Sequence, residues 1–394
     1  MKVLLVHNFY GSAAPSGENA VFELERQMLL DNGIDVCCFT RHSDDIRAKG
    51  MFGKIVGAAA TPWNPFAVGA FRKILHEYRP DVVHAHNTFP LISPAIFPAS
   101  KGVARVLTLH NYRLQCPAAI PMRDSKPCIS CIERRTVTPA LAHACYRGSR
   151  LATLPIAAKI ALNNVRGTWR HDIERFIALS EFQKELMIKG GLPAKKVTVK
   201  PNFYPGVPSR IPFDSRPQRV VFAGRVGEEK GVQDLVAAWR MWGADAPMLH
   251  IVGDGPLLET LRSESASLTN IRFLGQMTAQ EAERQIANAR LLVVPSRWFE
   301  GFPMVVREAL AFGVPVAVAN LGPLPTIVSP AGGLTFKPAD PKDLLSQVRK
   351  LWSEPEVLRN ASDLAECEFE NNYTQNRNFV QLLDIYAAAR AEIT

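Results

Sequence analysis

The sequence predicts an α/β protein built from two doubly wound domains, each a parallel sheet covered by helices on both faces. Three observations point to this fold class. Short apolar runs alternate with amphipathic helical stretches along the chain, as in parallel sheets that are buried on both faces. The same rhythm restarts after a proline-rich stretch at 201–217. Finally, 394 residues are too many for one ordinary core.

The first half supports a domain over residues 1–203. Apolar runs predict strands at 3–6, 36–40, 81–85, 105–109, 176–180 and 197–200. Helical periodicity predicts helices at 19–31, 66–77, 93–101 and 181–189.

The second half supports a domain over residues 204–371. Strands are predicted at 219–223, 248–252, 271–274, 291–295 and 314–318. Helices are predicted at 231–242, 256–264, 279–288, 304–312 and 342–351. A last helix in 372–394 follows, and we expect it to pack back on the first domain. Two such domains facing each other would place a ligand cleft at the carboxyl ends of their strands.

Composition and charge limit the classes of function. The chain is 47% hydrophobic and 21% charged, which is typical of a globular protein. The sequence contains no run of 18 apolar residues, which a membrane-spanning helix would need. The first residues also lack the long apolar core of a signal peptide, so we expect a cytoplasmic protein. Residues 1–205 hold 27 Lys and Arg against 15 Asp and Glu. This excess suits an anionic membrane surface or a phosphorylated acceptor, or simply solubility, whereas no nucleic-acid-binding motif is present.

Two glutamates stand eight positions apart, Glu300 and Glu308, in the stretch E-G-F-P-M-V-V-R-E. We expect Glu300 in the loop before a helix and Glu308 one to two turns inside it. Both carboxylates would then face one crevice, where the amide groups of the helix start are available to a phosphate. Glu308 would accept hydrogen bonds from ribose hydroxyls, as an acid does in dinucleotide-binding folds.

Two further strand ends carry phosphate-site signals. After the strand at 219–223 comes G-R-V-G-E-E-K-G, which places Arg225 and Lys230 where a diphosphate would lie. An Arg fork with a Lys point charge suits two linked phosphates. The strand at 248–252 ends in G-D-G-P, and its glycines, Gly253 and Gly255, let backbone approach a ligand closely.

In combination these motifs, G-R-x4-K-G, G-D-G-P and E-G-F-x5-E-A, resemble the family 4 glycosyltransferases of the two-domain GT-B fold. The resemblance implies a retaining transferase that uses a nucleotide-diphosphate sugar and needs no metal for catalysis. It implies that Arg225 and Lys230 neutralise the diphosphate, that Glu308 binds the ribose, and that Glu300 and the adjacent Phe302 belong to the donor-sugar site. The sequence departs from the family at Gly322–Thr326, where a common Gly-Gly-x-x-Glu turn lacks its glutamate.

The first domain offers matching positions at its own strand ends. A loop after the first strand contains Gly17 and Asn19, where the family has a glycine-rich loop that touches donor phosphate and acceptor. His110 and Asn111 follow the strand at 105–109, and the resemblance implies that His110 contacts the sugar. His86, at another strand end, is a candidate for the acceptor side or for a structural role.

Four of the seven cysteines fall close together, in the pattern C-x11-C-x2-C-x13-C, within an insert at about 115–148. They are Cys116, Cys128, Cys131 and Cys145. Four thiolates suit a structural zinc site or an iron–sulfur cluster, while unrelated thiols or two disulfides are the alternatives. The insert follows His110 directly and is expected to cap the acceptor site.

The sequence thus predicts a retaining glycosyltransferase that acts on a saccharide or lipid-linked saccharide, in cell-surface polysaccharide synthesis. The helical stretch at 151–170 is expected to be an ordinary amphipathic helix of the first domain. The alternative is that it rests, with the basic first domain, on the inner face of the membrane. A nucleotide-sugar epimerase of the same two-domain shape and a non-catalytic nucleotide-sugar-binding protein are the alternatives. A dehydrogenase is disfavoured because no G-x-G-x-x-G follows the first strand.

Overall fold

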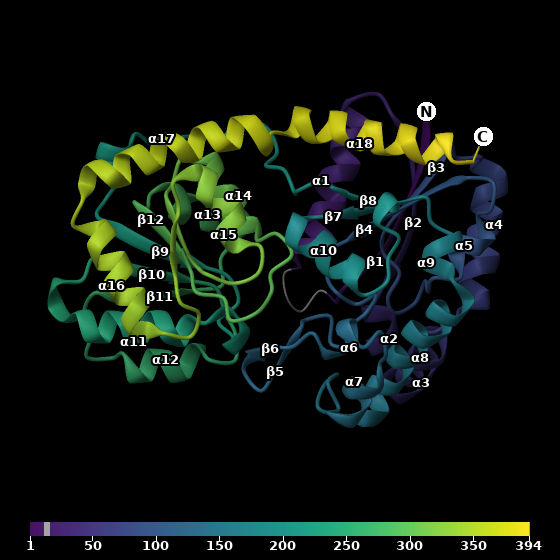
Figure 1. Ribbon diagram of the computed structural model, residues 1–394, viewed down its shortest axis with the longest axis horizontal. Helices are drawn as coiled ribbons and strands as arrows, with labels where there is room; N and C mark the ends of the chain where they lie inside the picture. The colour runs from purple at the N-terminus through teal and green to yellow at the C-terminus, as the bar shows by residue number, and fades with distance from the viewer. Residues whose placement is uncertain (12–15, 394) are drawn as a thin grey trace. The chain divides into compact units, whose positions relative to one another are not determined.

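The computed structural model describes residues 1–11 and 16–393, and these divide into two compact units (Figure 1). Unit 1 comprises residues 1–121, 129–201 and 378–394, and unit 2 comprises residues 122–128 and 202–377. Each unit is described by itself.

Unit 1 is built on a six-stranded parallel sheet in the order β2-β1-β3-β4-β7-β8. Its strands are β1 (Lys2–Phe9), β2 (Asp35–His42), β3 (Val82–Asn87), β4 (Ala104–Leu109), β7 (Arg175–Ala178) and β8 (Val197–Val199). The order reverses between β1 and β3, which pair in parallel with Val3 opposite Val82. Doubly wound sheets bind ligands outside the carboxyl ends of their strands at such a reversal.

The sheet of unit 1 is flanked by helices on the chain segments between its strands. They are α1 (Gly17–Asp31), α2 (Asp44–Ala48), α3 (Gly50–Ala60), α4 (Pro65–Tyr78), α5 (Ile96–Ala99), α6 (Ser130–Glu133), α7 (Thr138–Ala142), α8 (Arg150–Arg166), α9 (Thr168–His171) and α10 (Glu181–Lys189). Side-chain caps fix where the longer helices begin: Ser16, Ser149 and Ser180 accept backbone N–H bonds at the starts of α1, α8 and α10. Most of the last helix, α18 (Gln375–Ala391), belongs to unit 1.

Unit 2 has a second six-stranded parallel sheet, in the order β11-β10-β9-β12-β13-β14. Its strands are β9 (Arg219–Ala223), β10 (Met248–Val252), β11 (Ile271–Gly275), β12 (Leu291–Val294), β13 (Val316–Ala319) and β14 (Leu334–Phe336). Numbered from β9, the order is 3-2-1-4-5-6, that of the dinucleotide-binding folds. The short hairpin β5 (Met122–Arg123) and β6 (Lys126–Pro127), from the cysteine-rich insert, also falls within this unit.

Helices cover both faces of the unit 2 sheet, with α11, α12 and α16 on one side and α13 and α14 on the other in Figure 1. The helices are α11 (Val232–Trp242), α12 (Leu258–Glu264), α13 (Ala279–Ala287), α14 (Met304–Ala311), α15 (Leu324–Val328), α16 (Pro341–Trp352) and α17 (Pro355–Asn372). The core under α11 contains Trp239, which is fully buried and donates its indole N–H to Pro247 O at 2.8 Å. A buried indole N–H normally has such a partner.

The strand-and-helix alternation predicted from the sequence is confirmed, and β9 and β10 have the predicted bounds. The structure differs from the prediction in detail. The helix expected at 93–101 shortens to α5, because Ser93 takes a left-handed conformation next to Pro94. The sequence pattern missed β14 and the 18-residue helix α17, and the last helix begins at Gln375. Among the described residues, no helix is both long and apolar enough to cross a membrane.

Candidate active site

In unit 2, three neighbouring strands deliver their loops to one edge of the sheet. Strand β9 pairs with both β10 and β12, so the loops that follow these three strands meet where the strand order reverses. Arg225 follows β9, Gly253 follows β10, and Glu300 follows β12. The structure therefore brings the predicted donor-site segments together.

Close backbone packing joins these loops. A Cβ added to Gly253, whose φ is +126°, would lie 1.9 Å from Gly224 O, and one added to Gly255 would lie 2.4 Å from Val226 O. Only glycine fits at both positions, since either side chain would collide with backbone. The lack of a side chain at these two positions thus allows the β9 and β10 loops to pack directly against each other.

Glu300 is the centre of a polar network in unit 2. The residue is 4% exposed, and its Oε1 accepts hydrogen bonds from Lys230 Nζ at 2.8 Å, Ser296 Oγ at 2.6 Å and Trp298 Nε1 at 3.0 Å. Three donors on one oxygen fix the position of the carboxylate. Lys230 and Glu300, 70 positions apart in the sequence, therefore form one charge pair.

The other unit 2 residues differ in how firmly they are held. The Arg225 side chain is 63% exposed and lies 3.9 Å from a carboxylate oxygen of Glu229. Glu308 lies inside α14 and accepts a 3.1 Å bond from Arg307; burial raises the pKa of Glu308, while Arg307 opposes that shift. The ring of Phe302 packs against Tyr373 with centroids 5.3 Å apart, so any donor contact at Phe302 would come from its backbone.

In unit 1, two predicted histidines meet at the carboxyl ends of adjacent strands. His110 directly follows β4, and His86 lies near the end of β3. His86 Nδ1 is 2.9 Å from His110 Nε2, and the two rings stack with centroids 5.1 Å apart. A hydrogen bond of this length fixes the orientation of both rings.

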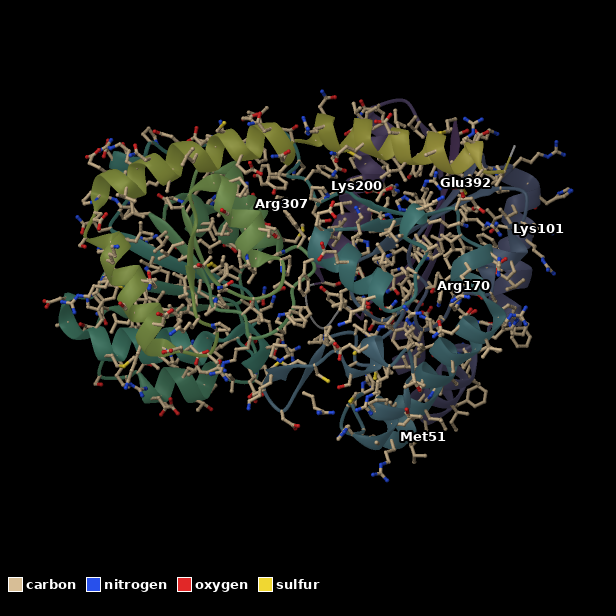
Figure 2. The ribbon with its side chains drawn as sticks, viewed as in Figure 1. Met51, Lys101, Arg170, Lys200, Arg307 and Glu392 are labelled. Carbon is tan, nitrogen blue, oxygen red and sulfur yellow. The ribbon has the colours of Figure 1, made fainter. Side chains whose placement is uncertain are left out.

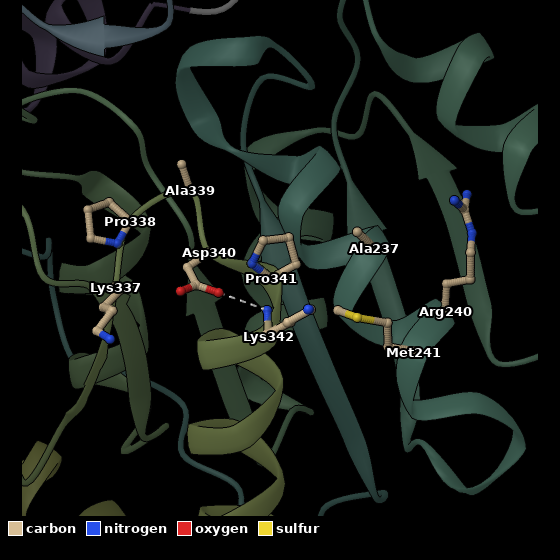
Figure 3. Close-up of a pocket in the computed structure, with 9 residues that line it drawn as sticks. All are labelled: Ala237, Arg240, Met241, Lys337, Pro338, Ala339, Asp340, Pro341 and Lys342. Carbon is tan, nitrogen blue, oxygen red and sulfur yellow. Dashed lines mark hydrogen bonds between the residues drawn. The ribbon is translucent and has the colours of Figure 1, made fainter.

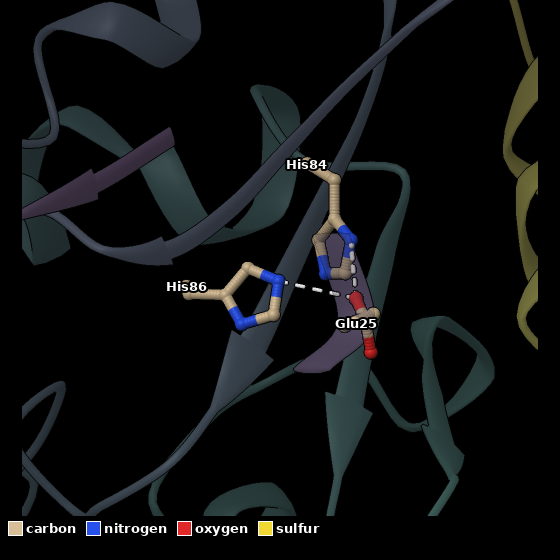
Figure 4. Close-up of side chains that lie close together, drawn as sticks. All are labelled: Glu25, His84 and His86. Carbon is tan, nitrogen blue, oxygen red and sulfur yellow. Dashed lines mark ion pairs between the residues drawn. The ribbon is translucent and has the colours of Figure 1, made fainter. Parts of the chain in front are cut away.

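Behind His86 lies a buried carboxylate that the sequence analysis missed. Glu25 Oε1 is 3.1 Å from His84 Nδ1 and 3.1 Å from His86 Nε2 (Figure 4), and Glu25 Oε2 accepts a 2.9 Å bond from Lys200 Nζ. Burial would raise the pKa of Glu25, but the charge of Lys200, then those of His86 and His84, hold it well below its ordinary value. The signal was present in the sequence: Glu25 interrupts the apolar face that Val21, Phe22, Met28 and Leu29 form on α1.

Glu25, His84 and His86 offer three donor atoms within 4.8 Å of one another, a grouping that suits a metal ion. Several of their atoms already have partners, although Glu25 Oε1 and His86 Nε2 form no hydrogen bond among the described residues. Lys200 occupies the second carboxylate oxygen, and the two ring nitrogens of His84 face Tyr386 Oη and Thr108 Oγ1, each at 2.8 Å. An ammonium group on the carboxylate repels a cation, so we assign this cluster to a hydrogen-bond network that also fixes α18 through Tyr386.

Burial keeps three histidines of unit 1 neutral: His7, His84 and His110. It lowers the pKa of His110 well below its ordinary value, and the charges of His86 and His7 lower it further. Burial is also the main cause that lowers the pKa of His7 to about 3 and that of His84 to about 4. At neutral pH His110 is therefore an imidazole that can donate and accept hydrogen bonds, with no positive charge.

The remaining predicted residues of unit 1 are partly tied to the scaffold. Asn19 Oδ1 lies 2.9 Å from His7 Nε2 and accepts from Tyr10 N–H at 3.2 Å. Asn111 Nδ2 donates to Glu18 Oε2 at 3.2 Å. Gly17 is the first residue of α1 and is exposed.

Three of the four clustered cysteines approach one another. Burial raises the pKa of the Cys116 thiol to about 12, and the nearby Cys131 and Cys145 raise it further, although a hydrogen bond from the backbone of Ala118 opposes the shift. Cys128 belongs to the segment that falls within unit 2. These thiols are of intermediate exposure. A bound cation would stabilise the thiolate form that burial disfavours at Cys116.

A surface depression in unit 2 contains none of the predicted site residues (Figure 3). It is lined by Ala237, Arg240, Met241, Lys337, Pro338, Ala339, Asp340, Pro341 and Lys342. Asp340 Oδ1 accepts a 3.1 Å bond from Lys342 N and so caps α16. These residues have a structural role at the start of that helix.

Two family models match the chain, one in each half. Residues 17–205 match the model described as "Glycosyltransferase Family 4", and residues 208–366 match "Glycosyl transferases group 1". Together the two matches cover all the strands of both sheets except β1.

Individual proteins match over nearly the whole chain. A Bacillus subtilis (strain 168) protein described as "Putative teichuronic acid biosynthesis glycosyltransferase TuaC" is 25% identical, over 94% of this chain and 95% of its own. The sulfoquinovosyl transferase SQD2 of Arabidopsis thaliana is 23% identical, over 90% of this chain and 67% of its own. Among solved structures, Anabaena HepE in complex with UDP has a TM-score of 0.66 at 16% identity, covering 98% of this chain and 100% of that one. Sucrose-phosphate synthase from Thermosynechococcus elongatus has a TM-score of 0.68 at 18% identity, with 99% of each chain covered.

Proposed function

This chain belongs to the family 4 glycosyltransferases of the GT-B fold, and from that premise we propose that it moves a sugar from a nucleotide-diphosphate sugar to a saccharide or lipid-linked saccharide, with retention of anomeric configuration. The observation that carries the proposal is the Lys230–Glu300 pair beside Arg225, at the strand-order reversal of unit 2. Relatives named for polysaccharide and lipid-linked products support the acceptor class.

The donor would bind at the loops after β9, β10 and β12. The Lys230 ammonium group, which bonds to Glu300, would also bind the diphosphate. The exposed Arg225 side chain would turn toward the diphosphate and bind it as well. Two cations there stabilise the charge that develops on the leaving diphosphate, which is the role a divalent metal has in other transferases. Glu308 would accept hydrogen bonds from the ribose hydroxyls, and Glu300 would contact the sugar.

Retention would proceed by attack on the same face that the diphosphate leaves. The acceptor oxygen forms a bond to the anomeric carbon, the bond from that carbon to the phosphate oxygen breaks, and the phosphate takes the acceptor's proton. A double displacement needs a free carboxylate nucleophile. Glu25, near His110, is unsuited to that role because it is buried and paired with Lys200. His110, a neutral imidazole, would position the sugar by hydrogen bonds.

We propose a peripheral position on the inner face of the cell membrane. The α3 helix exposes Met51, at 72%, together with Phe52 and Ile55, and Figure 2 shows Met51 at the outer margin of its unit. Helix α8, which contacts α3, exposes Leu151 and Val165. An apolar surface in a unit rich in Lys and Arg suits an anionic lipid surface.

A structural metal at the cysteine cluster is a further part of the proposal. Cys116, Cys131 and Cys145 would supply three thiolates, and Cys128 the fourth, to zinc or an iron–sulfur cluster. The group would hold the insert in shape and would take no part in sugar transfer.

The proposal is tested by nucleotide release from a panel of UDP-, GDP- and ADP-sugars, with and without total lipid extract. We expect release from one donor, stimulated by the extract. Conversion of the donor's sugar to its epimer without any acceptor would favour the epimerase alternative. Tight donor binding without release under either condition would favour the non-catalytic binding protein.

A further inference from the structure

Two cations share one aromatic ring in unit 1, beside the residues proposed for sugar transfer. The Cζ atom of Arg113 lies 4.3 Å from the centroid of Phe89, and the Nζ atom of Lys159 lies 5.6 Å from it. Arg113 follows β4, three residues after His110, while Phe89 follows β3 and Lys159 comes from α8. The pair therefore lies at the ligand-binding edge of the sheet.

Neither cation forms an ion pair with another residue in the described part of the chain, although Glu18 acts electrostatically on both. Lys159 is 5% exposed, and within the described part of the chain it forms no hydrogen bond or ion pair with another side chain. Arg113 donates from Nη1 to Pro117 O at 3.3 Å, while its buried Nε has no partner. Glu18 acts on both charges electrostatically, but among the described residues it forms no ion pair with either.

Burial of two like charges is unfavourable without an anion. Burial lowers the pKa of Lys159 to about 7, and the charge of Arg113 lowers it further. Burial also raises the pKa of Glu18 to about 7, so Glu18 and Lys159 are each only partly charged near neutral pH. An unpaired buried charge is unfavourable, and proteins offset it by a shift in pKa, by pairing it or by binding a ligand of opposite sign.

The surroundings favour a compact, strongly charged anion. The cations sit beside an apolar cluster of Phe89, Ile156 and Ile160, with Tyr10 and Tyr146 packed against it. In such low-dielectric surroundings a guanidinium fork and an ammonium group attract a phosphate strongly.

We propose that Arg113 and Lys159 form a binding site for a phosphate group of the acceptor. The inference rests on the proposed function, which it deepens by naming the acceptor as a phosphorylated or diphosphorylated saccharide. With its phosphate on these cations, the acceptor would have its sugar near His110. Tyr10, which follows β1, and Asn111, which holds Glu18, would border the same site.

Inorganic pyrophosphate is the first probe, measured by isothermal titration calorimetry on the full chain. The Arg225→Met/Lys230→Met variant serves as the background, because it removes the two cations of the proposed donor site. We expect one bound pyrophosphate in this background. Adding Lys159→Met or Arg113→Met should weaken binding about tenfold or more, the effect of losing a charged hydrogen bond.

Arg170→Met is the matched control, since Arg170 is an exposed cation of the same unit (Figure 2), and it should leave pyrophosphate affinity unchanged. Circular dichroism would confirm that each variant is folded. No binding in the background variant, or binding that survives Lys159→Met and Arg113→Met together, would overturn the site.

Two competitors distinguish the source of the phosphate. Displacement of pyrophosphate by an isoprenoid phosphate in micelles would identify a lipid-linked acceptor, and displacement by a hexose 1-phosphate would identify a soluble one. Displacement by neither would contradict an acceptor site. Donor-dependent nucleotide release, measured in parallel on the Arg170→Met control, reports on the proposed function separately and should persist without acceptor.

Discussion

His86 Nδ1 lies 2.9 Å from His110 Nε2. The opposite nitrogen of the His86 ring faces Glu25, whose charge is stabilised by Lys200. A ring nitrogen facing a carboxylate carries its proton there, because a lone pair in that place would repel the carboxylate. His86 is then an acceptor toward His110, which donates from Nε2 and keeps Nδ1 as an acceptor. The buried pair thereby sets the orientation of the residue proposed to contact the sugar.

The Glu25–Lys200 pair should be strongly coupled in stability. Removing either partner leaves an uncompensated buried charge, so Glu25→Gln and Lys200→Met should each lower the free energy of unfolding by about 3–5 kcal/mol. The double variant should lose clearly less than the sum, as measured by urea denaturation. Additive losses would mean that the two groups do not share one interaction.

Stability should depend on pH in a window set by the histidines. The folded-state pKa values of His7 and His84 are lowered to about 3 and about 4, so the unfolded chain binds more protons than the folded one as pH falls below about 6.5. Their contribution is complete above that pH and is lost as pH falls toward the folded values. Unfolding free energy should decline between pH 7 and 5, with part of the decline opposed by protonation of Glu18, whose pKa burial raises to about 7, and His84→Gln should flatten the decline. A constant value across that window would contradict the neutral buried histidines.

Substitutions of Arg225 and Lys230 should both weaken donor binding, but only the substitution of Lys230 should also lower stability. Arg225→Met should weaken donor binding about tenfold or more with little change in melting temperature, because the side chain is largely exposed. Lys230→Met should weaken donor binding and also destabilise the fold, because it leaves Glu300 buried without its partner. Calorimetry with the active donor and thermal denaturation measure the two effects. Unchanged donor affinity in both variants would rule out the diphosphate assignment.

The cysteine cluster makes a separate prediction. Purified protein should contain about one zinc ion or one iron–sulfur cluster per chain, and Cys131→Ala should lose it. Cys367→Ala is the matched control, because Cys367 is exposed and lies outside the insert. Elemental analysis and the visible absorption spectrum distinguish the two metals. A folded protein with no metal and an unchanged melting temperature after chelation would end the metal hypothesis.

The sequence predicted the architecture and the donor-side motifs well, since both follow from local patterns. Parallel strands read as apolar runs, and Glu300 falls in the loop before α14 with Glu308 inside that helix, as predicted. The Lys230–Glu300 pair and the Glu25–Lys200 pair could not be predicted, because they join positions 70 and 175 residues apart. The placement of Arg113 and Lys159 around one aromatic ring could not be predicted either, because it depends on how side chains distant in the sequence pack.

The most direct test of the account follows a labelled sugar from its nucleotide donor. With the active donor and acceptor, the label should appear in a glycosylated product with the donor's anomeric configuration, as read by nuclear magnetic resonance. His110→Ala should reduce that transfer at least about 100-fold while donor affinity changes little. Label found only in free sugar or in an epimer of the donor, or full transfer by His110→Ala, would contradict the account.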